Sequence, residues 1–68
     1  MTKGPAIPTN RLLRLREAAE YLSLSPWKMR NLIQSAELPI IQTGANAPWL
    51  LDRLDLDQWI ERKKRTLD

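Results

Sequence analysis

The sequence predicts a small, mainly α-helical domain that carries one short β-hairpin. Two neighbouring segments, about 15–23 and 26–36, place apolar residues at the i, i+3, i+4, i+7 spacing of one helical face. Two short apolar runs, about 40–43 and 49–51, flank a loop rich in turn-forming residues, which is typical of a hairpin. A third apolar helical face follows over about 53–65. A chain of 68 residues has room for one such domain.

The segment before the first helix permits two interpretations. Asn10 is a good N-cap for a helix that begins at Arg11; alternatively, Leu12 and Leu13 form a short extended lead-in that packs under the core. The register favours the lead-in, because Leu15 begins the first clean periodic set. That set comprises Leu15, Ala18, Ala19 and Leu22.

The second helix has a clear start signal. Ser25 is a preferred N-cap, because its hydroxyl can accept one of the orphan amide protons of the first turn. Pro26 then falls at the first helical position, where its missing N–H costs nothing, and Leu24 supplies an apolar plug in the turn. The apolar face comprises Met29, Leu32, Ile33 and Ala36. Two short helices joined by such a compact turn are typical of a helix-turn-helix motif, which predicts DNA binding.

The remaining elements follow in the order of a small winged helix-turn-helix domain. Pro39 ends helical structure, because the residue before a proline is pushed toward extended conformations. Asp52 is a good N-cap for the last helix. Leu56, Trp59 and Ile60 form that helix's apolar face. We expect the domain to span residues 11–66 and residues 1–10 to form a flexible arm, because the arm combines glycine and proline with little apolar content.

The composition excludes several classes of chemistry. The chain has no cysteine and no histidine, which rules out disulfides, cysteine nucleophiles, the usual zinc sites and Ser-His-Asp catalysis. Its carboxylates have helix-start or surface explanations, so we expect no enzyme, cofactor, metal or small-molecule substrate. No apolar run approaches the roughly 20 residues that span a membrane, so we expect no membrane partner. The net charge of +3 suits a nucleic-acid partner, and we expect a cytoplasmic, bacterial or phage-encoded protein.

The stretch from Leu12 to Glu61 resembles the excisionase-type, MerR-like winged helix-turn-helix DNA-binding domains. The shared features are the strings LREAAEYL, LIQSAELP and DLDQW, together with Gly44 and Trp49. The resemblance implies that the second helix enters the major groove of DNA and that the hairpin loop reaches the neighbouring minor groove. Members of the family include excisionases, which bend DNA and steer integrase-catalysed recombination, and small transcription regulators.

The sequence departs from the family pattern at three places. Ala36 stands where a helix-ending glycine is usual, and Arg14 occupies the usual Thr or Ser cap position. The wing usually carries an arginine beside its tryptophan, whereas Pro48 and Leu50 flank Trp49 here. Wing contacts to DNA through arginine are therefore not expected in this chain.

The helical period identifies the side chains of the second helix that face DNA. Relative to the buried stripe, Trp27, Asn31 and Gln34 point directly away, and Lys28 and Arg30 lie on the flanks. In a helix-turn-helix the N-terminal residues of the second helix reach base edges, which selects Trp27, Lys28 and Asn31. We expect Ser25 and Arg30 to contact phosphate, which fixes register without reading sequence.

Further candidates lie outside the second helix. Asn46 is the only wing side chain able to hydrogen-bond into a groove, and Arg62 and Lys63 begin a basic run that suits phosphate or a neighbouring copy. Ordinary structural roles stand beside these assignments. Trp27 fits a core or partner contact as well as DNA, the cations fit solvated helix ends, and Trp49 and Trp59 fit the core.

Three functions fit these features. The first is an excisionase-type accessory factor that binds and bends attachment-site DNA cooperatively to promote excision by a tyrosine or serine integrase. The small number of cations favours self-association on DNA in this case, because adjacent copies raise apparent affinity through effective concentration. The second is a small transcriptional regulator. The third is a protein-interaction or packaging adaptor with the same fold, which the uncharged wing favours.

Overall fold

The structure, a computed structural model, describes residues 10–67. The elements occur in the following order: β1 (Leu12–Arg14), α1 (Leu15–Leu22), α2 (Pro26–Gln34), β2 (Leu50–Asp52) and α3 (Arg53–Lys63). The three predicted helices are confirmed, and each ends one or two residues earlier than the sequence indicated. The predicted flexible arm lies, except for Asn10, outside the described residues.

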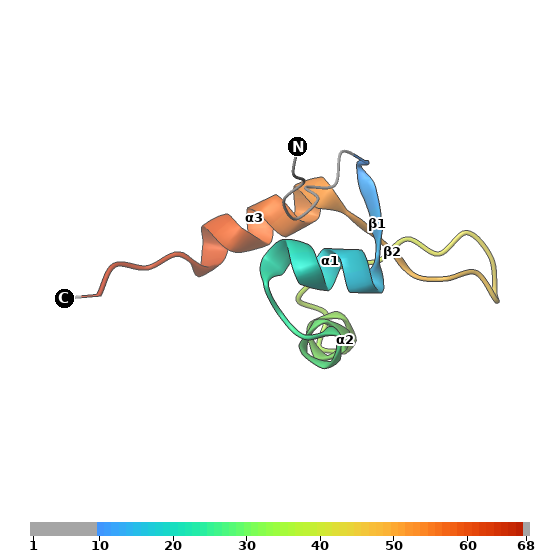
Figure 1. The fold of residues 1–68 in the computed structure, drawn as a ribbon, viewed down its shortest axis with the longest axis horizontal. Coiled ribbons are helices and arrows are strands. Elements are labelled where there is room, and N and C mark those ends of the chain that lie inside the picture. Colours follow the sequence, from blue (N-terminus) through green and yellow to red (C-terminus); the bar gives the residue numbers. More distant parts are fainter. Residues whose placement is uncertain (1–9, 68) are drawn as a thin grey trace, which may run out of the picture.

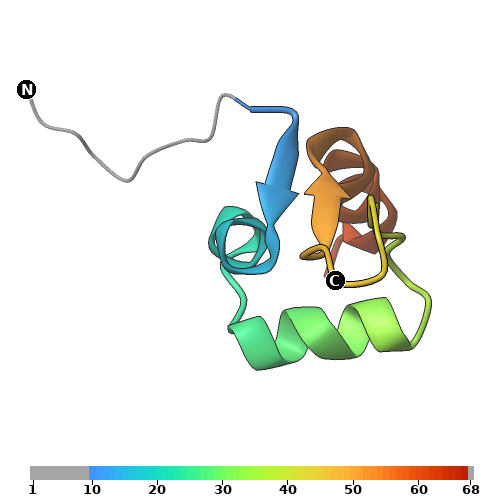
Figure 2. The ribbon, with the colours of Figure 1, turned by 90° about the vertical axis from the view of Figure 1, so that its right-hand side faces the viewer.

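The helices pack around a two-stranded sheet, in a winged helix-turn-helix arrangement (Figure 1). α1 packs against both α2 and α3, and α3 also contacts β2. α2 lies along the lower border of the molecule, below α1, and is seen along its length in Figure 2. The wing loop, residues 42–49, projects from the body on the side where α1 begins. No helix among residues 10–67 has the length and apolar character needed to cross a membrane.

The small sheet corrects one part of the sequence prediction. Its strands are β1 and β2, so the extended lead-in before α1 is confirmed. The antiparallel register pairs Leu12 with Asp52, Leu13 with Leu51, and Arg14 with Leu50. A strand over 40–43 was predicted and is wrong, because within that run only Ile41 forms a bridge, to Leu50. The other predicted strand, 49–51, forms at Leu50–Asp52 and pairs mainly with β1.

Two prolines explain why the predicted hairpin stops at one bridge. Ile41 and Leu50 exchange both backbone hydrogen bonds, at 2.8 and 2.9 Å, and therefore form a hydrogen-bonded pair. In an antiparallel ladder the next such pair would join Thr43 to Pro48, and proline has no N–H to donate. Pro39 occupies the corresponding position on the other side of the bridge. The ladder therefore ends in both directions after one pair.

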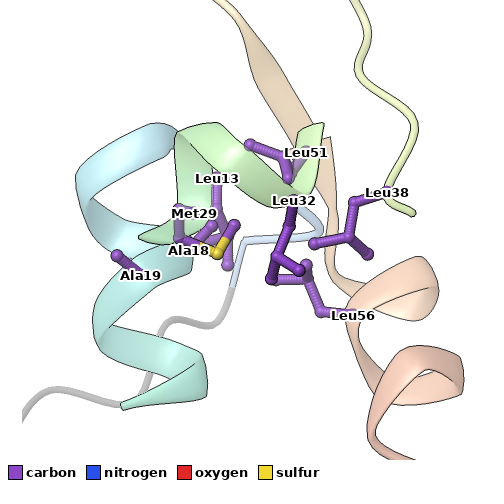
Figure 3. Packing of buried hydrophobic residues seen from close by; sticks show 8 residues of the cluster. All are labelled: Leu13, Ala18, Ala19, Met29, Leu32, Leu38, Leu51 and Leu56. Carbon is purple, nitrogen blue, oxygen red and sulfur yellow. The ribbon is translucent and has the colours of Figure 1, made fainter. Parts of the chain in front are cut away.

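The core lies where the helices meet the sheet (Figure 3). Eight apolar side chains form it, and all are at most 7% exposed. They are Leu13, Ala18, Ala19, Met29, Leu32, Leu38, Leu51 and Leu56. Trp59 packs on this cluster and is only partly buried, as is Trp49. Ala18 and Ala19 let α1 approach the other elements closely, because neither side chain extends beyond Cβ.

Both helices of the motif end in left-handed residues. Ser23 has φ 60° and Ala36 has φ 67°, and each follows the last turn of its helix. After α1 the amide of Leu24 donates to the carbonyl of Ala19, and after α2 the amide of Glu37 donates to the carbonyl of Leu32. These bonds are those of a Schellman motif, which satisfies carbonyls at a helix end and prefers glycine at the left-handed position. α2 thus ends by the geometry that suits glycine, although alanine is present.

Candidate nucleic-acid interface

The turn between α1 and α2 fixes how α2 is presented. The Ser25 hydroxyl accepts a hydrogen bond from the Lys28 amide at 3.1 Å, so the predicted N-cap is confirmed. Pro26 stands at the first turn of the helix as expected. Met29 and Leu32 are buried against the rest of the domain, which leaves the opposite side of α2 along the border of the molecule (Figure 2).

The exposed side of α2 carries most of the side chains that the sequence selected. Trp27 is 72% exposed, and Lys28, Arg30 and Gln34 are also exposed. Asn31 differs from the helical-wheel expectation, because it is only half-exposed. Residues four apart on a helix are neighbours, and the large Trp27 side chain belongs to the turn before Asn31. The outermost surface of α2 is thus formed by an indole, two cations and an amide.

This surface is electropositive because no acid interrupts it. The sequence has no Asp or Glu between Glu20 and Glu37, a stretch that contains both Lys28 and Arg30. Neither cation forms an ion pair with another residue in the described part of the chain. Their charges are therefore available to an external anion.

The wing loop is shaped by polar bonds but carries no charge. The Gln42 side-chain amide donates to the carbonyl of Ala47 at 3.0 Å, and the Ala47 amide donates to the carbonyl of Gly44 at 3.1 Å. Asn46 lies within this turn and is exposed. The sequence has no charged residue between Glu37 and Asp52, so the loop exposes the neutral polar side chains of Gln42, Thr43 and Asn46 rather than cations.

The structure divides the basic run at the end of α3 into two kinds of cation. Lys63 lies 3.1 Å from a Glu37 carboxylate oxygen and 6.0 Å from the centroid of the Trp59 ring. The Trp59 indole donates to the same oxygen at 3.1 Å. The hydrogen bonds from Trp59 and Lys63, of which the one from Trp59 has the larger effect, hold the pKa of Glu37 below its ordinary value. Lys63 therefore already has an acidic partner, and the pair links the end of α3 to the segment that follows α2.

Lys64 is likewise paired, 3.0 Å from Glu61 one turn earlier. Arg62 and Arg65 are exposed, and neither has an ion-pair partner within residues 10–67. The sequence could not separate the two paired lysines from the two unpaired arginines, because the ion pair of Lys63 joins the end of α3 to Glu37, which follows α2.

Two cations that the sequence did not select are also available. Arg14 and Arg16, at the start of α1, are exposed and have no ion pair inside the described range. Their signal in the sequence is weak, because Arg14 stands at the cap position of the first helix rather than on the face of the second. The backbone amide of Arg14 instead donates to Glu17 at 2.9 Å, which satisfies the start of the helix without the arginine side chain.

Arg11, by contrast, is fully engaged on the far side of the molecule. Its guanidinium makes two hydrogen bonds to Asp52, at 3.1 and 2.9 Å, beside the start of α3. These bonds, followed by one from the Leu54 amide, lower the pKa of Asp52. The pair ties the beginning of β1 to the end of β2, which lies at the upper border in Figure 1, away from α2.

Comparison with known proteins agrees with this geometry. A family model described as a helix-turn-helix domain matches residues 12–64, which is most of the chain. No curated protein and no solved structure matches the sequence. Among residues 10–67, no three acidic side chains gather in a way that would hold a metal ion. The matched range includes α1, the turn and α2, and the chain therefore belongs to the helix-turn-helix domain family of DNA-binding proteins.

Proposed function

We propose that the protein is an excisionase-type accessory factor, which binds double-stranded DNA through α2 and bends it cooperatively in support of an integrase. The observation that carries the proposal is the exposed side of α2, where Lys28 and Arg30 have neither an acidic neighbour along the helix nor an ion pair in the described structure. Major-groove binding by the second helix is the general docking mode of a helix-turn-helix.

In this proposal the first turns of α2 read bases. Lys28 can donate to guanine and Asn31 can form two hydrogen bonds with adenine. Trp27 offers an apolar surface to base edges. Arg30 and the Ser25 hydroxyl contact phosphate and fix the register of the helix, with Gln34 farther along the groove. Asn46 is the side chain of the wing loop that enters the minor groove.

The small number of cations supports cooperative binding. Of the two elements that face the grooves, α2 supplies two available cations and the wing loop supplies none, so these two elements of one copy neutralise few phosphates. Neighbouring copies on a longer site would raise apparent affinity through effective concentration. Such an array of small domains suits a protein that shapes DNA for a recombinase, without catalysing a reaction itself.

Binding is tested by fluorescence anisotropy on a generic duplex over a salt series. We expect Arg30→Ala to weaken binding and to reduce the log–log salt slope by about 0.9, because it removes a phosphate contact. Lys28→Ala should weaken binding chiefly on duplexes that carry guanine where Lys28 contacts the base. Arg11→Gln is the matched control: it also removes one positive charge, but from the face opposite α2, and it should leave the slope unchanged. Absence of wild-type binding at low salt would refute the proposal.

Bending and stoichiometry separate the excisionase role from that of a regulator. We expect energy transfer between dyes at the two ends of a duplex to rise as protein is added, and a long duplex to bind several copies in succession. Binding without bending would favour a small transcriptional regulator. If no duplex binds, the uncharged wing loop favours an adaptor that contacts another protein.

A further inference from the structure

We propose that the segment from Arg62 to Arg65 is a second DNA contact, which binds backbone phosphates on the flank of the site opposite the wing loop. The proposal rests on the proposed function, because it takes α2 as the element in the major groove. It assigns a separate contact to a part of the chain that lies outside the motif.

The first support is the position of the segment. In Figure 1 the longest axis of the molecule is horizontal, with the wing loop at one end and the residues after α3 at the other. α2 lies between these two ends and below them. The longest dimension is 46 Å, which exceeds the rise of one turn of B-DNA, about 34 Å. When α2 lies in the major groove and the duplex axis runs along this longest dimension, the duplex passes under both ends.

The second support is that neither arginine has an ion pair within the described structure. A cation in the last turn of a helix interacts favourably with the helix dipole, which favours both Arg62 and Lys63, and the charge of Arg62 also helps to lower the pKa of Glu37. Arg65 lies beyond the end of α3, directly after Lys64, whose backbone is extended. Neither arginine has an ion pair in the described structure, whereas the two lysines between them do.

The third support is the matching chemistry of the guanidinium group. Arginine donates in a planar fork that suits phosphate oxygens, and it is more weakly hydrated than an ammonium group. An extended residue spans at most about 3.6 Å, so the side chain of Arg65 has additional reach past the end of the helix. The two paired lysines fix the direction of the segment, and the two arginines contact the duplex.

The test compares variants that remove the same charge from different places. Arg62→Gln with Arg65→Gln should reduce the log–log salt slope by about 1.8, because two phosphate contacts are lost. Arg53 is the first residue of α3, and its amide donates to the Arg11 carbonyl at 2.7 Å, beside the Arg11–Asp52 pair. Arg11→Gln with Arg53→Gln therefore also removes two positive charges, away from α2, and should leave the slope unchanged. Circular dichroism at the assay temperature confirms that each variant is folded.

The absence of cysteine permits a direct mapping experiment. Asn46→Cys and Thr66→Cys each introduce a single thiol, which is coupled to an iron chelate that cleaves nearby DNA. On the tightest duplex selected from a random pool, we expect the two conjugates to cleave on opposite sides of the segment protected by α2. Cleavage on the same side, or none from position 66, would overturn the inference.

The outcomes distinguish the two proposals. Wild-type binding with an unchanged slope in the arginine variant refutes the second contact and leaves the role of α2 intact. If Lys28→Ala and Arg30→Ala bind as tightly as the wild type while Arg62→Gln with Arg65→Gln binds more weakly, the proposed docking of α2 is refuted instead. No binding by the wild-type protein refutes both.

Discussion

Replacing Ala36 by glycine should stabilise the protein, although it removes a methyl group. Ala36 has φ 67° in the turn that follows α2, and its side chain is exposed. Its amide donates to the carbonyl of Ile33 at 3.0 Å, and the next amide, of Glu37, donates to Leu32 at 2.9 Å. The helix end is thus held in the left-handed conformation by backbone bonds that glycine preserves.

The magnitude follows from two opposing terms. A left-handed backbone costs an L-residue with a Cβ about 1–2 kcal/mol, and glycine escapes this cost. Glycine also gains freedom in the unfolded chain, which reduces the benefit by about 0.4–1 kcal/mol. The net expectation for Ala36→Gly is a gain of between about 0 and 1.6 kcal/mol in the free energy of unfolding, with a central value of about 0.8 kcal/mol. For a domain of this size the central value raises the melting temperature by about 3–6 °C.

Thermal and urea unfolding, followed by circular dichroism, measure the change. Ala47→Gly is the matched control, because it also replaces an alanine by glycine, but in the wing loop, where the φ of Ala47 is not positive. The free energy of unfolding of this variant should fall by about 0.4–1 kcal/mol, because glycine gains freedom in the unfolded chain and no left-handed strain is relieved. Equal losses in the two variants would refute the reasoning, since the sign must follow the backbone conformation. A stabilised Ala47→Gly would refute it as well.

Three further predictions concern the contacts that hold α3. Leu56→Ala should lower the free energy of unfolding by about 2–5 kcal/mol, measured in urea, because Leu56 is 0% exposed and leaves a cavity. Tyr21→Phe should lower the melting temperature, because the Tyr21 hydroxyl donates to Asp57 at 2.5 Å; Asp57→Asn retains an acceptor and should lose less. The pKa of Asp52 is lowered in the folded state by the hydrogen bonds from Arg11, so its contribution is present above the unfolded pKa and is lost as pH falls through the folded one. Melting curves between about pH 5 and pH 2 should therefore show falling stability, and Asp52→Asn should flatten that dependence; an unchanged slope would contradict the assignment.

The helices were predictable because their signals are local. Ser25 and Asp52 cap α2 and α3 in the structure as the sequence indicated. Each side chain accepts a hydrogen bond from a backbone amide at most three residues further along the chain. The apolar period also identified which side of α2 is buried, through Met29 and Leu32. Such signals need no knowledge of distant residues, since a helix is bonded within itself. The strand over 40–43 failed for the opposite reason, because a strand exists only through its partner.

By itself, the sequence determined the helix-turn-helix, the N-caps of α2 and α3, the charge of α2 and the lack of charge in the wing loop. Tertiary structure decided the partner of β2, because Leu50 offers one edge to β1 and the other to a single bridge from Ile41. It also decided which cations remain available: Lys63 reaches Glu37 only because the fold brings the end of α3 beside the segment that follows α2. The physical reason is common to both cases, since pairs between residues far apart in sequence form only when the core has brought their elements together.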